Sequence, residues 1–206
     1  KDFNTEEKLM LKKTTLILVL FTIISLAGKT AYCISLNLTP GQINEAIEYG
    51  KNNKRSSPTN FAKPWVVHLG EKSGWATLWT PYHNVAFNAK KAAVEKRELS
   101  EGETLRALHF KESMTFVVSV FGNYMEFARG YNAILYSEDK PVYPMYAFHP
   151  EFAEPSSFYP EEPAYVAGCV YKFPVESINQ DSTLKLLITS PEGEELEFPF
   201  DLVKIK

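Results

Sequence analysis

The stretch TLKLLITSPEGEELEFPFDLV, residues 183–203, decides the fold class. Apolar side chains alternate along both of its arms, at Leu184, Leu186 and Ile188, and then at Leu196, Phe198, Phe200 and Leu202. A period of two is typical of a strand that is buried on one face. Residues 190–193, Ser-Pro-Glu-Gly, predict a turn between the arms, because proline presets φ and glycine tolerates the left-handed conformation. The stretch therefore predicts an antiparallel hairpin.

A two-stranded hairpin is marginal alone in water, so its apolar face needs a facing layer. Alternation of apolar residues begins at Met114 and recurs through Tyr143, Met145 and Ala147, which predicts further antiparallel strands. Residues 149–163 contain four prolines and predict a long ordered loop or an irregular edge. The strand spacing resembles that of an immunoglobulin-like sandwich, although the Cys, Trp, Cys signature of a true immunoglobulin domain is missing.

Helix signals come before most of these strands. Capping boxes or Thr-Pro starts occur at Thr39-Pro40-Gly41-Gln42, Thr80-Pro81 and Ser100-Glu101-Gly102-Glu103. The second helix carries a stripe of small residues that would let it lie close against a sheet. Residues 52–63 read as a polar loop, and residues 65–69 and 75–79 as strands. We therefore expect an α+β fold in which N-terminal helices (34–112) pack against a C-terminal antiparallel β-sandwich (113–206).

The N-terminus has the pattern of an export signal. Met10-Leu11-Lys12-Lys13 is followed by an uncharged apolar run from Thr14 to Gly28, which is short for a bilayer span. We interpret residues 10–33 as a signal peptide, residues 1–9 as upstream sequence translated from a wrong start, and residues 34–206 as a single mature domain. No integral membrane segment is expected after cleavage, and the predicted location is the periplasm or the cell exterior.

Two cleavage sites fit the small-residue rule, one after Cys33 and one after Ala27, and the first is favoured. Cys33 does not fit a lipoprotein signal, because Tyr32 stands where a small residue is required. Cleavage after Cys33 leaves Cys169 alone, whereas cleavage after Ala27 would allow the two cysteines to pair. Cys169 alternates with apolar neighbours, and we expect a buried, inert thiol.

Charge and motifs exclude several classes of function. Residues 34–206 hold 17 basic and 22 acidic residues, a formal charge of −5, so a nucleic-acid partner is not expected. Phosphate-binding glycine loops, His-Glu-x-x-His, Gly-x-Ser-x-Gly and Cys-x-x-Cys are missing from the sequence. The acidic loop at 149–162 lacks the Asp/Asn/Gly alternation of a calcium loop. We therefore expect no catalytic motif, no metal site and no cofactor.

One cluster of residues remains as a candidate ligand site. It comprises Trp65, His68, Glu71, Trp75, Trp79 and Tyr82, and it holds all three tryptophans of the chain. If exposed, these rings would stack on a sugar or anchor a protein partner; if buried, they form the seam between helices and sheet. Both interpretations stay open on the sequence alone.

The sequence favours a non-catalytic envelope protein of the bacterial type, which binds or interacts with an unknown protein or glycan partner. The alternative is a hydrolase that acts on a glycan or another envelope polymer. Two carboxylates far apart in sequence, such as Glu71 and Glu126, can meet in space and leave no local motif. Paired acids in an aromatic cleft would favour the hydrolase, and an acid-free surface would favour binding.

Overall fold

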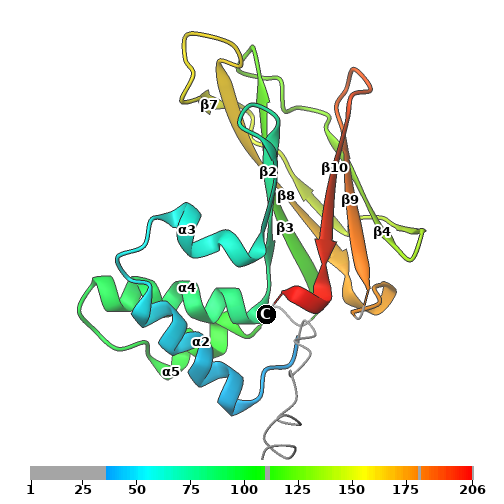
Figure 1. The fold of residues 1–206 in the computed structure, drawn as a ribbon. Coiled ribbons are helices and arrows are strands. Elements are labelled where there is room, and N and C mark those ends of the chain that lie inside the picture. The colour runs from blue at the N-terminus through cyan, green and yellow to red at the C-terminus, as the bar shows by residue number, and fades with distance from the viewer. Residues whose placement is uncertain (1–35, 110–111, 181, 206) are drawn as a thin grey trace, which may run out of the picture. The chain divides into compact units, whose positions relative to one another are not determined.

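The computed structural model describes residues 36–109, 112–180 and 182–205. The expected signal peptide, Cys33 and residues 1–9 lie outside this range. The predicted fold class is confirmed: helices dominate the N-terminal part, and two antiparallel sheets pack together in a β-sandwich-like C-terminal region (Figure 1).

The predicted helix starts are confirmed, with one addition. The helices are α2 (Pro40–Asn52), α3 (Pro58–Ala62), α4 (Pro81–Val94) and α5 (Glu101–Ala107), with short 3-10 turns at η1 (Lys63–Trp65), η2 (Val175–Ser177) and η3 (Leu202–Lys204). Thr39 and Ser100 form the two capping boxes, and Thr80 accepts a hydrogen bond from the backbone N–H of His83. Helix α3 lies within the segment predicted to be a polar loop, because Ser57 caps it and Pro58 suits its first turn.

The strands of sheet A come from both halves of the sequence, and those of sheet B come from the C-terminal half. Sheet A has the order β1-β2-β3-β8-β6, with β7 also paired to β8; its strands are β1 (Val66–Gly70), β2 (Gly74–Trp79), β3 (Ser113–Gly122), β6 (Tyr146–Phe148), β7 (Glu154–Pro155) and β8 (Tyr165–Pro174). Sheet B has the order β10-β9-β4-β5, formed by β4 (Asn132–Ser137), β5 (Lys140–Val142), β9 (Thr183–Thr189) and β10 (Glu195–Asp201). The hairpin β1–β2 thus comes from the helical half of the sequence and completes sheet A.

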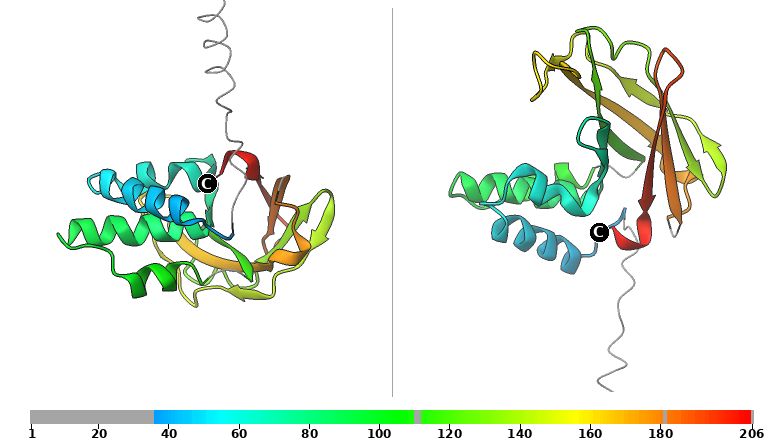
Figure 2. Two further views of the ribbon diagram at one scale, coloured as in Figure 1. Left: turned by 90° about the horizontal axis from the view of Figure 1, so that it is seen from below. Right: turned by 45° about the horizontal axis from the view of Figure 1, so that its top comes forward.

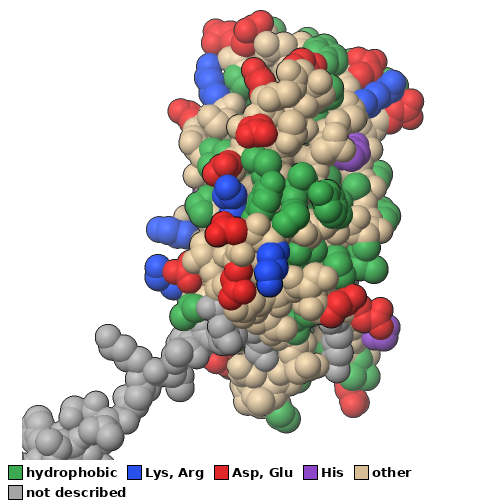
Figure 3. Space-filling view, turned by 90° about the vertical axis from the view of Figure 1, so that its right-hand side faces the viewer, with side chains coloured by type: hydrophobic (Ala, Val, Ile, Leu, Met, Phe, Trp, Pro, Cys, Tyr) green, Lys and Arg blue, Asp and Glu red, His purple; other side chains and the backbone are tan. Residues whose placement is uncertain are grey.

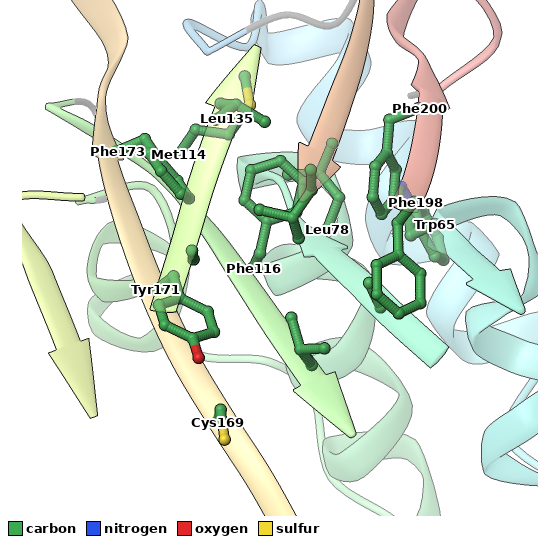
Figure 4. Close-up of a cluster of buried hydrophobic side chains, with 14 of the residues drawn as sticks. Trp65, Leu78, Met114, Phe116, Leu135, Cys169, Tyr171, Phe173, Phe198 and Phe200 are labelled. Atoms are coloured by element: carbon green, nitrogen blue, oxygen red, sulfur yellow. The ribbon is translucent and has the colours of Figure 1, made fainter. Parts of the chain in front are cut away.

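The C-terminal hairpin lies as the alternation predicted. Leu186 pairs with Phe198 across β9 and β10, and both side chains are fully buried. Facing them, Phe116 of sheet A meets Phe200 edge-on with ring centroids 5.1 Å apart (Figure 4). On the outer face Lys185 and Glu197 are exposed and form a surface ion pair, with Nζ and Oε1 3.4 Å apart. The two sheets therefore enclose an apolar interior.

The far edge of the sandwich corrects one prediction. Alternation at Tyr143 and Met145 predicted one face of a strand, but the chain leaves sheet B after Val142 and joins sheet A at Tyr146. Tyr143 and Met145 lie in the crossing and are 66% and 64% exposed. An alternating pattern this short cannot distinguish a strand from a passage between two sheets. Figure 3 views the molecule from the side on which sheet B lies. Apolar side chains gather in the middle of this view, among charged ones.

The small residues of α4 pack on a helix rather than on the sheet. Helices α2 and α4 lie side by side (Figure 2). A Cβ atom built on Gly50 of α2 would lie 2.3 Å from the backbone oxygen of Ala86 and 2.8 Å from Cβ of Ala89. The alanine stripe therefore allows α2 and α4 to approach closely, and the prediction that this stripe packs on a sheet is wrong.

Two further predictions concern Cys169 and residues 149–163. Cys169 is a free, fully buried thiol, as expected, and burial raises its pKa to about 11. Residues 149–163 form the expected irregular edge, where only Glu154 and Pro155 pair with β8. Within the described ranges, none of the helices has the length and apolar character needed to cross a bilayer.

Candidate functional site

A pocket of about 470 Å³ lies between the outer face of sheet A and helices α3 and α4. Its floor is a row of paired residues across three strands, Val66 of β1, Thr77 of β2 and Val117 of β3. Trp75 and Trp79 flank Thr77 on the same face of β2. The alternation of β2 explains this placement, because the residues between them turn into the sandwich and are fully buried.

The helical wall of the pocket comes from α3 and α4. Phe61 of α3 faces it, and His83, Phe87 and Lys90 of α4 line it at spacings of four and three residues. Residues at this spacing lie on one face of a helix. The pocket is therefore bounded mainly by aromatic rings and aliphatic side chains, with few polar groups. Pockets for small molecules typically measure ~300–1,000 Å³ and have walls of this composition.

A stack of three rings connects the pocket to the core. His83 lies between Trp65 and Trp79, with ring centroids 4.2 and 4.3 Å away and interplanar angles of 3° and 19°. Trp65 is buried on the inner side of this stack, whereas Trp79 is partly exposed. The edge of Phe87 meets Trp79 at a centroid distance of 5.4 Å. These contacts hold the Trp79 ring in place.

His83 lines the pocket with a buried ring. Its side chain is only 1% exposed, and Nδ1 lies 3.3 Å from the carbonyl oxygen of Leu78, to which it donates. Burial lowers the pKa of the ring to about 4, although the bond to Leu78 partly opposes this. The ring is therefore neutral at pH 7, and its Nε2 is an acceptor that bonds to none of the described residues.

Lys90 supplies the charge of the pocket. Its Nζ donates to the backbone oxygen of Ser56 at 2.6 Å and lies 4.5 Å from the centre of the Phe61 ring. Partial burial lowers the pKa of its ammonium group. Among the described residues that line the pocket there is no Asp or Glu, so the charge of Lys90 is not neutralised there.

The loop at 149–162, a separate cluster in the sequence, reaches the Trp75 end of the site. Phe121 of β3 lies between Trp75 and Phe158, with ring centroids 5.8 and 5.9 Å away. Lys72, in the turn between β1 and β2, donates to the backbone oxygen of Glu162 at 2.9 Å. The loop therefore braces the β1–β2 hairpin, which carries both Trp75 and Trp79.

The six candidate residues fall into three groups. His68, Trp75 and Trp79 line the pocket. Trp65 and Tyr82 are buried in the core, 1% and 3% exposed, and offer no surface to a ligand. Glu71 is exposed in the β1–β2 turn and does not line the pocket.

Sequence reasoning missed the helical wall, formed by Phe61, His83, Phe87 and Lys90. A signal for part of it exists, since positions 83, 87 and 90 recur with helical period. That period alone assigns a face of α4 but does not show that the face lies opposite β2.

The carboxylates considered for hydrolysis do not line the pocket. Glycoside hydrolysis needs two carboxyl groups about 5 to 9.5 Å apart, and the described residues that line this pocket include none. Glu71 and Glu126 are both exposed and lie outside it. In the part of the chain that the structure describes, three or more His, Cys, Asp or Glu side chains nowhere gather to hold a metal ion.

Comparison with known proteins adds little to this description. No protein-family model matches the chain, and no curated protein matches it. Among solved structures, it is similar to a chain of the archaellum periplasmic stator protein complex FlaF and FlaG from Sulfolobus acidocaldarius. The identity is 11% and the TM-score 0.27, over 43% of this chain and 77% of that one. A similarity this distant does not bear on function, so the pocket has to be interpreted from its own geometry.

Proposed function

We propose that residues 34–206 form an exported, non-catalytic binding domain of the cell envelope, and that the pocket beside Trp75 and Trp79 is its ligand site. The observation that carries this proposal is an aromatic surface left partly open on a rigid sheet, while the large rings between the sheets are fully buried. Lys90, which lines the pocket and is only partly buried, adds a polar group that a ligand can contact. Ligand sites characteristically combine apolar walls with a few such polar groups.

The paucity of polar groups in the pocket favours an apolar ligand group over a sugar. A sugar ring presents several hydroxyls, and each one that is buried without a partner costs about 1–3 kcal/mol. The pocket's flat tryptophan faces instead match a hydrocarbon or aromatic group. A hydrolase acting on a glycan is correspondingly disfavoured, because substrate polarity and paired carboxylates are both unmatched.

Export rests on the basic start at Met10 and the apolar run after it. Expression of the chain from Met10 in a bacterium, followed by intact-mass analysis of the exported protein, tests this part of the proposal. We expect a mature chain that begins at Ile34 and carries no lipid. A mass that includes Cys33 with acyl chains would place the protein on a membrane surface instead.

Ligand binding at the pocket can be tested with the three tryptophans as reporters. The mature domain is titrated with octanol and, separately, with octanoate, while the indole N–H signals are followed by proton–nitrogen NMR. We expect the signals of Trp75 and Trp79 to shift with saturation, and that of buried Trp65 to move least. Replacing Thr77 on the floor by phenylalanine should block both titrations, while Thr183→Phe on the outer face of sheet B should leave them unchanged. If no probe moves Trp75 or Trp79 more than Trp65, the pocket is not a ligand site.

A further inference from the structure

The charge of the pocket indicates which charge its ligand should carry, in addition to an apolar body. Lys90 brings a positive charge to the pocket, and no carboxylate among the described lining residues balances it. His83 is neutral at pH 7, because burial lowers its pKa to about 4. A cation held against an apolar wall without a counter-ion favours a ligand of opposite charge, since the Coulomb attraction strengthens where water is excluded.

Lys90 is also placed so that its ammonium group stays at the pocket. Its hydrogen bond to the backbone oxygen of Ser56 uses one of three N–H donors, and its position over the Phe61 ring fixes the end of the side chain. The neighbouring Lys91 is exposed and does not line the pocket. The remaining donors of Lys90 are thus available beside the aromatic walls formed by Phe61 and Phe87.

We infer that the ligand is an amphiphilic organic anion, whose apolar body lies on Trp75 and Trp79 and whose anionic head, such as a carboxylate, meets Lys90. This inference rests on the proposed function and specifies its ligand class. Aromatic walls can also hold quaternary ammonium groups, which is the main competing ligand class. The charge of Lys90 opposes that class, because like charges repel within a few ångströms in an apolar pocket.

Three probes with the same tail and different heads test the inference: octanoate, octanol and octyltrimethylammonium. Without Lys90 the neutral alcohol should bind better than the acid, because a carboxylate is costly to dehydrate. We expect wild-type protein to reverse this order, with octanoate bound roughly tenfold more tightly than octanol, the size of an effect of one favourable ion contact. Octyltrimethylammonium should bind most weakly.

Variants at Lys90 identify the source of the preference. Lys90→Met should weaken octanoate binding by more than tenfold, to below that of octanol, and should affect octanol far less. Lys90→Arg should keep the preference for octanoate, and Lys91→Met should change neither affinity. An unaltered Trp65 signal verifies folding of each variant. If octanol binds as tightly as octanoate, or if octyltrimethylammonium is preferred, the inferred anionic ligand is wrong. The proposed binding site would not be affected by that result. Failure of all three probes to shift Trp75 and Trp79 would overturn the proposed function itself.

Discussion

Aromatic rings are plentiful both between the two sheets and between sheet A and the helices. The first layer is closed to solvent, whereas the second is partly open. Between the sheets, Phe116, Phe198 and Phe200 are covered on both sides and fully buried. On the outer face of sheet A, the short helices cover Trp65 but leave Trp75 and Trp79 partly exposed. Aromatic residues in the closed layer contribute to stability, whereas those in the half-open layer also form the surface that we propose as a ligand site.

The strongest effect is expected in the closed layer. Phe198→Ala removes a fully buried ring opposite sheet A and should lower the free energy of unfolding by ~3–5 kcal/mol. Glu197→Ala, one position away on the outer face, loses only an exposed ion pair and should cost ~0.5 kcal/mol or less. Denaturant melts of both variants measure the difference. Equal losses would show that the two faces of β10 are not distinguished by burial.

The half-open layer should respond to pH through His83. The pKa of His83 is about 4 in the folded chain, against 6.5 for a free side chain. Between pH 4 and pH 6.5 the ring is therefore protonated in the unfolded state but not in the folded state. Stability is then complete above pH 6.5 and falls as the pH drops toward 4, by up to about 3 kcal/mol. Melts of wild type and His83→Phe across this range test the expectation.

The His83→Phe variant keeps an aromatic ring between the tryptophans but cannot titrate, so most of the loss of stability between pH 6.5 and 4 should disappear. A smaller slope should persist, because burial also lowers the pKa of His149. An identical slope in wild type and variant would mean that the folded state tolerates a charged His83.

A smaller effect is expected where α2 crosses α4. Gly50→Ala places a Cβ atom against Ala86 and Ala89 and should cost ~1–3 kcal/mol, because the backbone of α4 must move. Gly41→Ala in the same helix is the matched control, since its Cβ would have nothing closer than the Thr39 hydroxyl at 3.9 Å. Thermal melts of the two variants should differ in sign or clearly in size. Similar melting of both would indicate that the helices can separate without loss.

The sequence by itself determined the local elements and their inward faces. Alternation placed Leu186 and Phe198 on the buried face, and the capping boxes at Thr39 and Ser100 marked the starts of α2 and α5. These features depend on neighbours within a few residues, which is why they are readable along the chain. The α+β class followed from their order.

Only the tertiary structure decided which elements face each other. It moved Trp65 and Tyr82 into the core, opened Trp79 to the pocket, and brought His83 and Lys90 opposite β2. It also turned the alternation near Tyr143 into a passage between sheets. Burial of a side chain depends on elements distant in sequence, and the same ring is core or surface according to what packs over it. The pocket is therefore a property of packing, although every residue in it is visible in the sequence.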